Sequence, residues 1–145
     1  MTKTIITDEE RIKSIIRETF EGDVNQRQYF IWKTHEDSIK DTFEKNKEAR
    51  DLYSSHFYEL TAEDGRLLGF INIIPSLNML FSFGLKQEER TEENKRYFIQ
   101  AIEEAIPNGD IACSLYSKNT RGIRFLENNG FSRQENTITL VKKRE

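Results

Sequence analysis

One nine-residue stretch of the chain, Leu-Asn-Met-Leu-Phe-Ser-Phe-Gly-Leu, places an apolar residue at every second position. These apolar positions are Leu77, Met79, Phe81, Phe83 and Leu85. Because successive side chains of a β-strand point to opposite faces of a sheet, the spacing predicts a half-buried strand over residues 77–85. A chain with such a strand needs a sheet and a layer that covers one face of it.

The segment after this strand predicts a helix and then another strand. Thr91 is a residue type that caps helices, and the apolar spacing extends the helix to about Ile106. A Pro-Asn-Gly run at 107–109 ends it, and a strand is expected at Ile111–Tyr116. Two strands joined through a helix are parallel, so the sequence predicts one parallel βαβ unit with a right-handed crossover.

The rest of the chain supplies further elements. The expected ones are a strand at Thr2–Thr7, a helix from Asp8 to Phe20, a helical region over Asn25–Tyr53 with a second cap near Thr34, strands at His56–Ala62 and Arg66–Ile74, a helix at Asn119–Asn129, and one or two strands within Phe131–Lys143. In the long helical region, the expected buried anchors are Trp32, Ile39, Phe43 and Leu52. The order is β–α–α–β–β–β–α–β–α–β.

Composition limits the number of domains and the classes of function. The chain has 145 residues with seven Gly and two Pro, and no linker or repeat divides it, so a single domain over residues 1–145 is expected. The net charge of −3 argues against a strongly cationic nucleic-acid binder. One cysteine and two histidines leave no internal disulfide and no expected metal site.

The location of the protein and the sign of its ligand are further expectations from composition. No apolar run reaches the roughly 20 residues of a membrane helix, and the N-terminus lacks the apolar core of a signal peptide. A cytoplasmic protein without a membrane partner is therefore expected. Residues 111–145 carry seven basic and three acidic side chains. An anionic ligand is thus expected at the C-terminal third, and a cationic one elsewhere.

The segment Asn119-Thr-Arg-Gly-Ile-Arg-Phe-Leu-Glu-Asn-Asn-Gly-Phe131 adds a motif to this order of elements. It resembles the Asn-x-Arg-Ala-x-x-x-Tyr-x-x-x-Gly-Phe signature near the C-terminus of the GNAT superfamily, the acyl-CoA-dependent N-acyltransferases. The whole chain fits the resemblance. It implies an α/β (α+β) fold with a mixed, mostly antiparallel sheet, one parallel βαβ unit and helices on both faces.

The resemblance also implies acetyl-CoA as co-substrate and an amine as acceptor. In GNAT proteins the pantetheine pairs with the backbone of the strand before the central helix, and the diphosphate lies at the start of that helix, where free N–H groups favour an anion. The last helix is often near the nucleotide end. The cofactor-binding residues carried over in this way are Phe83, Gly84, Leu85, Arg90, Asn119, Arg121 and Arg124.

The diphosphate loop departs from the family pattern. Glu93 and Lys95 stand at the two positions where the family has glycine. Glu88, Glu89 and Glu92 are also close in sequence, and each unscreened like-charge pair near 4 Å costs roughly 1–4 kcal/mol. We therefore expect four carboxylates around the diphosphate position, which would weaken binding unless they point outward. The nearby cations Arg90, Lys95 and Arg96 are the expected compensation.

The proton-transfer residues also depart from the pattern. Many members use a tyrosine of the signature as general acid, and this chain has Leu126 there. Tyr116, at the end of the strand beside the cleft, is the substitute candidate, although a packed tyrosine would look the same in sequence. Glu59 is the candidate general base, as the mid-strand carboxylate of the earlier strands, although such a residue often faces solvent.

Three functions are compatible with these features. The first is an acetyl-CoA-dependent N-acetyltransferase that acts on a primary amine of a small molecule or a protein. The second is a catalytically inactive GNAT-like domain that serves as a binding or regulatory module, which the acidic loop and Leu126 favour. The third, a ferredoxin-like nucleic-acid module, is disfavoured by the charge. Family members often form dimers, so a homodimer is an open alternative.

Overall fold

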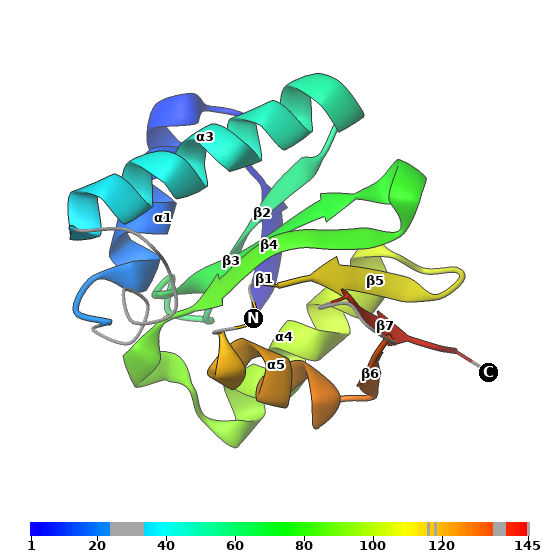
Figure 1. Cartoon of the computed structure of the whole chain (residues 1–145). Coiled ribbons are helices and arrows are strands. Elements are labelled where there is room, and N and C mark those ends of the chain that lie inside the picture. The colour runs from blue at the N-terminus through cyan, green and yellow to red at the C-terminus, as the bar shows by residue number, and fades with distance from the viewer. Residues whose placement is uncertain (24–33, 116, 118, 135–138, 145) are drawn as a thin grey trace.

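The computed structural model describes residues 1–23, 34–115, 117, 119–134 and 139–144 (Figure 1). Helices and strands alternate in the order that the sequence predicts. The strands are β1 (Thr2–Ile5), β2 (His56–Thr61), β3 (Leu67–Ile74), β4 (Met79–Leu85), β5 (Ile111–Ser114), β6 (Phe131–Arg133) and β7 (Thr139–Lys142). The helices are α1 (Glu9–Phe20), α3 (His35–Tyr53), α4 (Glu92–Ala105) and α5 (Thr120–Glu127). Short 3-10 turns at Pro75–Leu77 and Gln87–Glu89 flank β4.

The strands form one seven-stranded sheet in the order β1-β2-β3-β4-β5-β7-β6. Every described pair is antiparallel except β4 with β5, which is parallel as the βαβ spacing predicts. The parallel pair is short, because it joins Met79 to Ala112 and Leu80 to Cys113 and then stops. The later half of β4 therefore has a neighbour on the β3 side and diverges from β5 on the other side. This confirms the predicted fold class.

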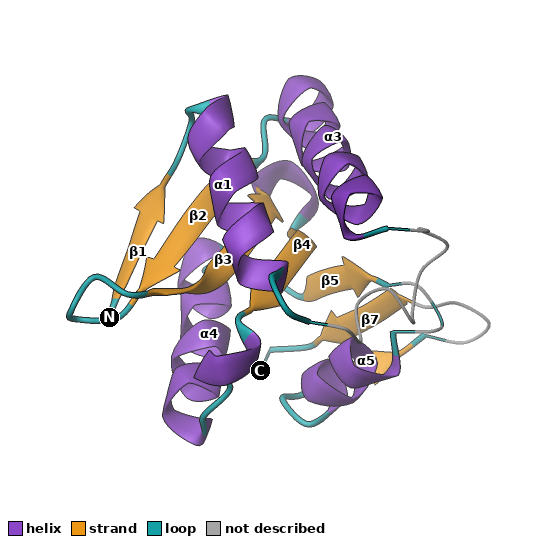
Figure 2. Cartoon of the chain, turned by 90° about the vertical axis from the view of Figure 1, so that its left-hand side faces the viewer, coloured by secondary structure: helices purple, strands orange, loops and turns teal. Residues whose placement is uncertain are grey.

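The helices pack on both faces of the sheet. Figures 1 and 2 show α1 and α3 together on one side of the central strands and α4 on the other. The core under α1 and α3 consists of Ile12, Ile15, Ile16, Ile39, Phe57, Leu67 and Phe70. The second and larger core joins side chains of α4 and α5 to the sheet, among them Phe98, Ile102, Ile123, Leu126, Leu80 and Leu140. Burial of these two apolar layers is the main stabilisation of the fold.

Three predicted helix caps are present as side-chain hydrogen bonds. The hydroxyl of Thr34 accepts from the backbone N–H of Asp37, and that of Thr91 accepts from Asn94, each at 3.1 Å. The side chain of Asn119 accepts from the N–H of Gly122 at 3.0 Å. Each cap satisfies an amide that the first turn of a helix leaves without a partner. These caps begin α3, α4 and α5 at the predicted residues.

The expected anchors of α3 are partly wrong. Ile39 is 1% exposed and confirms its prediction, and Phe43 is half-buried, but Leu52 is 63% exposed. Leu52 lies thirteen residues after Ile39, which at about 3.6 residues per turn places it roughly 140° around the helix from Ile39. Asn46 and Ala49 face the sheet instead. Trp32 lies outside the described residues.

The strand predicted from the alternation is shorter and less regular than expected. Leu77 belongs to the 3-10 turn before β4 and is 50% exposed. The pairing of β3 with β4 shifts between Asn72–Ser82 and Ile73–Leu80, so Phe81 is an extra residue in β4. Such a bulge interrupts the period of two, and Leu80 rather than Met79 is fully buried. The bulge follows directly after the last residue that pairs with β5.

Within the described ranges, no helix has the length and apolar character needed to cross a membrane. Those same ranges contain no cluster of three His, Cys, Asp or Glu side chains placed to hold a metal ion.

Candidate functional site

A cavity of about 1130 Å³ lies where β4 diverges from β5. Its walls come from the end of β4, the turn before α4, one side of α4, and α5. The fold brings these elements together because α4 crosses from β4 to β5 and α5 follows β5. The cavity is lined by all seven residues for which the sequence predicts a binding role: Phe83, Gly84, Leu85, Arg90, Asn119, Arg121 and Arg124.

Aromatic rings form the apolar part of the cavity. The ring of Phe83 on β4 lies 5.9 Å from that of Phe98 on α4, and Phe98 lies 5.7 Å from Phe125 on α5, both with edge-to-face geometry. This row of rings connects the strand to the two helices. It gives the cavity an apolar wall that suits the aliphatic part of a ligand.

Gly84 lets α1 approach β4 at the edge of this cavity. A Cβ atom at Gly84 would lie 2.7 Å from Cζ of Phe20 and 2.8 Å from Cγ2 of Thr19, both at the end of α1. A side chain at this position would therefore push α1 away. Phe20 lines the cavity as well, so the contact also shapes the cavity.

Arg90 is held by the protein at one end of the cavity. Its Nε donates to the backbone oxygen of Leu85 at 3.0 Å, and one of its terminal nitrogens donates to the carboxylate of Asp23 at 2.8 Å. The side chain of Asp23 is only 6% exposed. The guanidinium group thus links the end of β4 to the residues after α1, and its predicted contact with a diphosphate remains a prediction.

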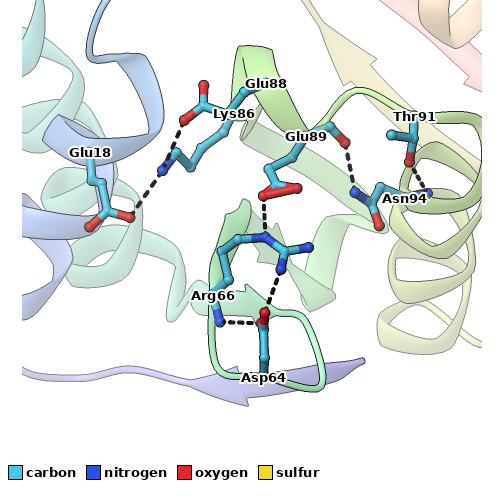
Figure 3. A network of polar contacts seen from close by, with 8 residues as sticks. All are labelled: Glu18, Asp64, Arg66, Lys86, Glu88, Glu89, Thr91 and Asn94. Atoms are coloured by element: carbon cyan, nitrogen blue, oxygen red, sulfur yellow. Dashed lines mark hydrogen bonds and ion pairs between the residues drawn. The ribbon is translucent and has the colours of Figure 1, made fainter.

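The glutamates before α4 differ from the expectation of four carboxylates around one phosphate position. Lys86 lies 3.4 Å from Glu18 of α1 and 3.2 Å from Glu88, and Nε of Arg66 donates to the carboxylate of Glu89 at 2.5 Å (Figure 3). Of Glu88, Glu89, Glu92 and Glu93, only Glu92 lines the cavity. The expected repulsion is therefore reduced, because cations on neighbouring elements pair with two of the carboxylates.

These pairs also shift the ionisation of their members. Partial burial lowers the pKa of Lys86, but the carboxylates of Glu88 and Glu18 outweigh it and raise the pKa overall. A hydrogen bond from its own backbone N–H, together with Lys86, lowers the pKa of Glu88. Both groups therefore stay charged at neutral pH and remain paired.

The two predicted proton-transfer residues are not brought together in the cavity. Glu59 pairs with Arg11 of α1, its side chain is 12% exposed, and it does not line the cavity, because β3 separates β2 from β4. Tyr116 and the basic residue Lys118 lie outside the described residues. Leu126, at the signature position of the tyrosine, is fully buried in the core between α5 and the sheet.

Many cavity residues had no binding role assigned from the sequence, among them Asp23 and also Arg96, which was expected only as a compensating charge. Asp23 follows Gly22, whose φ of 75° ends α1, and the sequence marks both residues only as the end of a helix. Arg96 lies on α4 and lines the cavity with an exposed side chain. Its helical spacing from Arg90 and Lys95 does not indicate which of these cations faces a cavity.

A sheet with one parallel strand pair that opens onto a cavity between two helices is the architecture that the resemblance to the GNAT superfamily implies. Neither a protein-family model nor a curated protein sequence matches the chain. Solved structures do match, at sequence identities below a quarter, and matches at this level establish the fold alone.

Three of the similar structures are acetyltransferases that match this chain over nearly their whole length. PaiA N-acetyltransferase of Thermoplasma acidophilum, solved with coenzyme A, is 21% identical, with 99% of this chain and 100% of that chain covered and a TM-score of 0.67. A GNAT-family acetyltransferase of Staphylococcus aureus is 16% identical, with 98% and 99% covered and a TM-score of 0.61. Aminoglycoside acetyltransferase AAC(6')-Ib, solved with coenzyme A, is 15% identical, with 99% and 95% covered and a TM-score of 0.66. The chain therefore has the GNAT fold.

Proposed function

We propose that the protein is an acetyl-CoA-dependent N-acetyltransferase that transfers an acetyl group to a primary amine of a small molecule or a protein. The observation that carries the proposal is the cavity beside the diverging β4, which is lined by all seven residues assigned to acetyl-CoA from the sequence. Coenzyme A in two of the similar structures supports the same ligand here. A cytoplasmic location is part of the same proposal and is supported by the need for acetyl-CoA.

In the proposed reaction, the amine nitrogen attacks the thioester carbonyl. A C–N bond forms, the C–S bond breaks, the thiolate leaves and takes a proton, and the amine loses one. The contribution of this chain is to place the thioester along the free edge of β4, where a backbone N–H can stabilise the oxyanion. The aromatic wall of Phe83, Phe98 and Phe125 excludes water from the acyl arm.

The proton-transfer roles follow from the same proposal. Tyr116 is the proposed general acid for the thiolate. Glu59 would reach the amine only through intervening water, because its carboxylate pairs with Arg11 outside the cavity. Among the similar structures are an aminoglycoside acetyltransferase and a spermidine N-acetyltransferase, and the substrates in both names are cationic amines. An excess of acidic side chains in residues 1–110 would suit a cationic acceptor here as well.

The alternative is a GNAT-like domain without catalysis that acts as a binding or regulatory module. Its support is the buried Leu126 at the signature position of the acid, together with the engagement of Arg90 by Asp23 and Leu85. A fold does not by itself fix an activity. This alternative predicts a folded protein that releases no coenzyme A with any amine.

Calorimetric titration with acetyl-CoA, followed by a free-thiol assay over a panel of amines, tests the proposal. We expect a dissociation constant of about tens of micromolar or tighter, and amine-dependent thiol release that saturates. As a control, Arg133→Ala should bind acetyl-CoA as the wild type does, because Arg133 lies on β6 and does not line the cavity. Absence of heat up to about millimolar acetyl-CoA from folded protein would exclude the acetyltransferase. Binding without thiol release would favour the module.

A further inference from the structure

We propose that this chain holds the phosphates of its acyl-CoA with guanidinium groups on α4 and α5, rather than with backbone amides at the start of α4. The residues are Arg96, Arg121 and Arg124. The inference rests on the proposed function and names how the same cavity would recognise the charged end of the co-substrate.

Several polar groups at the start of α4 are engaged in contacts within the protein. Glu89 is 7% exposed; its carboxylate accepts from Arg66 of the β2–β3 hairpin, and its backbone oxygen accepts from the side chain of Asn94 at 2.9 Å (Figure 3). The N–H of Asn94 donates to Thr91. The amide of Asn94 and the side chains of Glu89 and Asn94 are therefore already paired, and a phosphate that used these groups would have to displace their partners.

The same turn also lacks the means for close backbone approach. An anion site at a helix start depends on free N–H groups and on a backbone that a phosphate can reach, which glycine provides. Here Glu92 and Glu93 place two carboxylates in the first turn, where they already balance the positive end of the helix. Glu92 also lies 3.8 Å from Lys95, so the positive charge of Lys95 is partly neutralised before a phosphate arrives.

Arg96, Arg121 and Arg124 differ from the other arginines of the fold. All three are exposed and line the cavity, and within the described part of the chain none of them forms an ion pair. Arg121 and Arg124 are three residues apart on α5, so they share one face of that helix. Most arginines elsewhere do have an acidic partner: Arg11, Arg17, Arg50, Arg66 and Arg90.

The acids of the cavity do not cancel this charge. Three of the four acids that line the cavity have a basic neighbour: Asp23 is bound by Arg90, Glu92 lies near Lys95, and Glu104 lies 3.8 Å from Lys3 of β1. The fourth, Glu103, forms no ion pair within the described residues, and it is one carboxylate against three guanidinium groups. The three arginines therefore leave an excess of positive charge between α4 and α5. A guanidinium group binds phosphate oxygens with two parallel hydrogen bonds, and it does so without help from the backbone.

The experiment compares three ligands by calorimetry: coenzyme A, 3′-dephospho-coenzyme A and acetyl-pantetheine, which carries no phosphate. Arg96→Ala, Arg121→Ala and Arg124→Ala are measured beside the control Arg133→Ala. We expect each cavity variant to weaken coenzyme A about tenfold, as loss of a charge-assisted hydrogen bond does, and to leave acetyl-pantetheine unchanged. Arg→Lys at the same positions should recover part of the lost affinity. Lysine keeps the positive charge but lacks the paired N–H donors of the guanidinium group.

Two further measurements separate this site from the start of α4. The affinity of the wild type for coenzyme A should fall between about 0.05 M and 0.3 M salt, and this fall should be smaller in the variants, because the exposed arginines are screened. Glu93→Gly with Lys95→Gly, which restores the two glycines, should change affinity less than about threefold.

The outcomes distinguish this inference from the proposed function. If wild-type protein binds coenzyme A and the three alanine variants bind it equally well, the guanidinium site is wrong while the acetyltransferase proposal stands. The same conclusion follows if acetyl-pantetheine weakens as much as coenzyme A, since the effect is then not on phosphate. If folded wild-type protein does not bind coenzyme A, the proposed function fails and this inference fails with it.

Discussion

Arg90 donates a hydrogen bond of 2.8 Å to the carboxylate of Asp23, although the two residues are 67 positions apart in the sequence. Arg90 follows β4 and Asp23 follows α1, so the bond joins the ends of two elements at the cavity. The close contact of α1 with Gly84 brings them together. The relationship couples the shape of the cavity to the packing of α1, and it leads to the first prediction.

Removal of this guanidinium should destabilise the fold. Arg90→Ala is expected to lower the free energy of unfolding by about 1–3 kcal/mol, because the buried carboxylate of Asp23 loses a charged donor and the Leu85 oxygen loses its partner. Urea denaturation of Arg90→Ala, Asp23→Asn and the double variant measures it. A coupling energy of at least about 0.5 kcal/mol is expected. Purely additive effects would contradict a direct contact.

The thiol of Cys113 should make stability fall in alkaline solution. Complete burial raises its pKa from 9.0 to about 12, so the folded protein keeps the proton while the unfolded chain releases it from about pH 9 upward. The free energy of unfolding therefore falls between about pH 9 and pH 12, by about 1.4 kcal/mol per pH unit, and the thiol has no such effect at lower pH.

The measurement is a comparison of wild type with Cys113→Ala at about pH 8 and about pH 10. From about pH 8 to about pH 10, the free energy of unfolding should fall by about 1.4 kcal/mol more in the wild type than in the variant. Any loss of stability from the smaller side chain of the variant is the same at both pH values and does not affect this difference. Equal pH dependence in the two proteins would show that the thiol does not carry the effect. A thiol reagent at neutral pH should label Cys113 only after unfolding.

Two glycines on neighbouring strands should differ in their tolerance of alanine. Gly84→Ala is expected to destabilise by about 1–3 kcal/mol, because its Cβ meets the movable side chains of Phe20 and Thr19. Gly69→Ala should cost more, because its Cβ would lie 2.0 Å from the backbone oxygen of Gly84. Thermal unfolding of both variants shows which is less stable. If Gly69→Ala were more stable than Gly84→Ala, the close packing of these two strands would be contradicted.

Alanine substitutions at two apolar residues of α3 should have very different effects on stability. Ile39→Ala is expected to lower the free energy of unfolding by about 2–5 kcal/mol, since Ile39 is 1% exposed and packs in the core under α1 and α3. Leu52→Ala should change it by less than about 0.5 kcal/mol, because Leu52 is 63% exposed. Denaturant titration of both variants measures these changes. A large decrease in the free energy of unfolding of Leu52→Ala would mean that a partner covers this residue.

The elements of this fold were predictable where their signals are local. The caps at Thr34, Thr91 and Asn119 depend on a side chain and an amide three residues away, so the sequence contains all that they need. The period of two in β4 failed at Phe81, because a bulge depends on the register with β3. The prediction that Leu52 is buried was wrong, because the face of a helix that is buried depends on what the helix packs against.

The sequence by itself determined the order of elements, the parallel βαβ unit and seven of the residues that line the cavity, since these follow from short-range periodicity and from the resemblance to one family. The tertiary structure decided which charges meet. The pairing of Glu89 with Arg66 and that of Arg90 with Asp23 join residues 23 and 67 positions apart. Such contacts depend on strand register and helix packing together, and no local pattern of residues encodes the distance between two side chains on different elements.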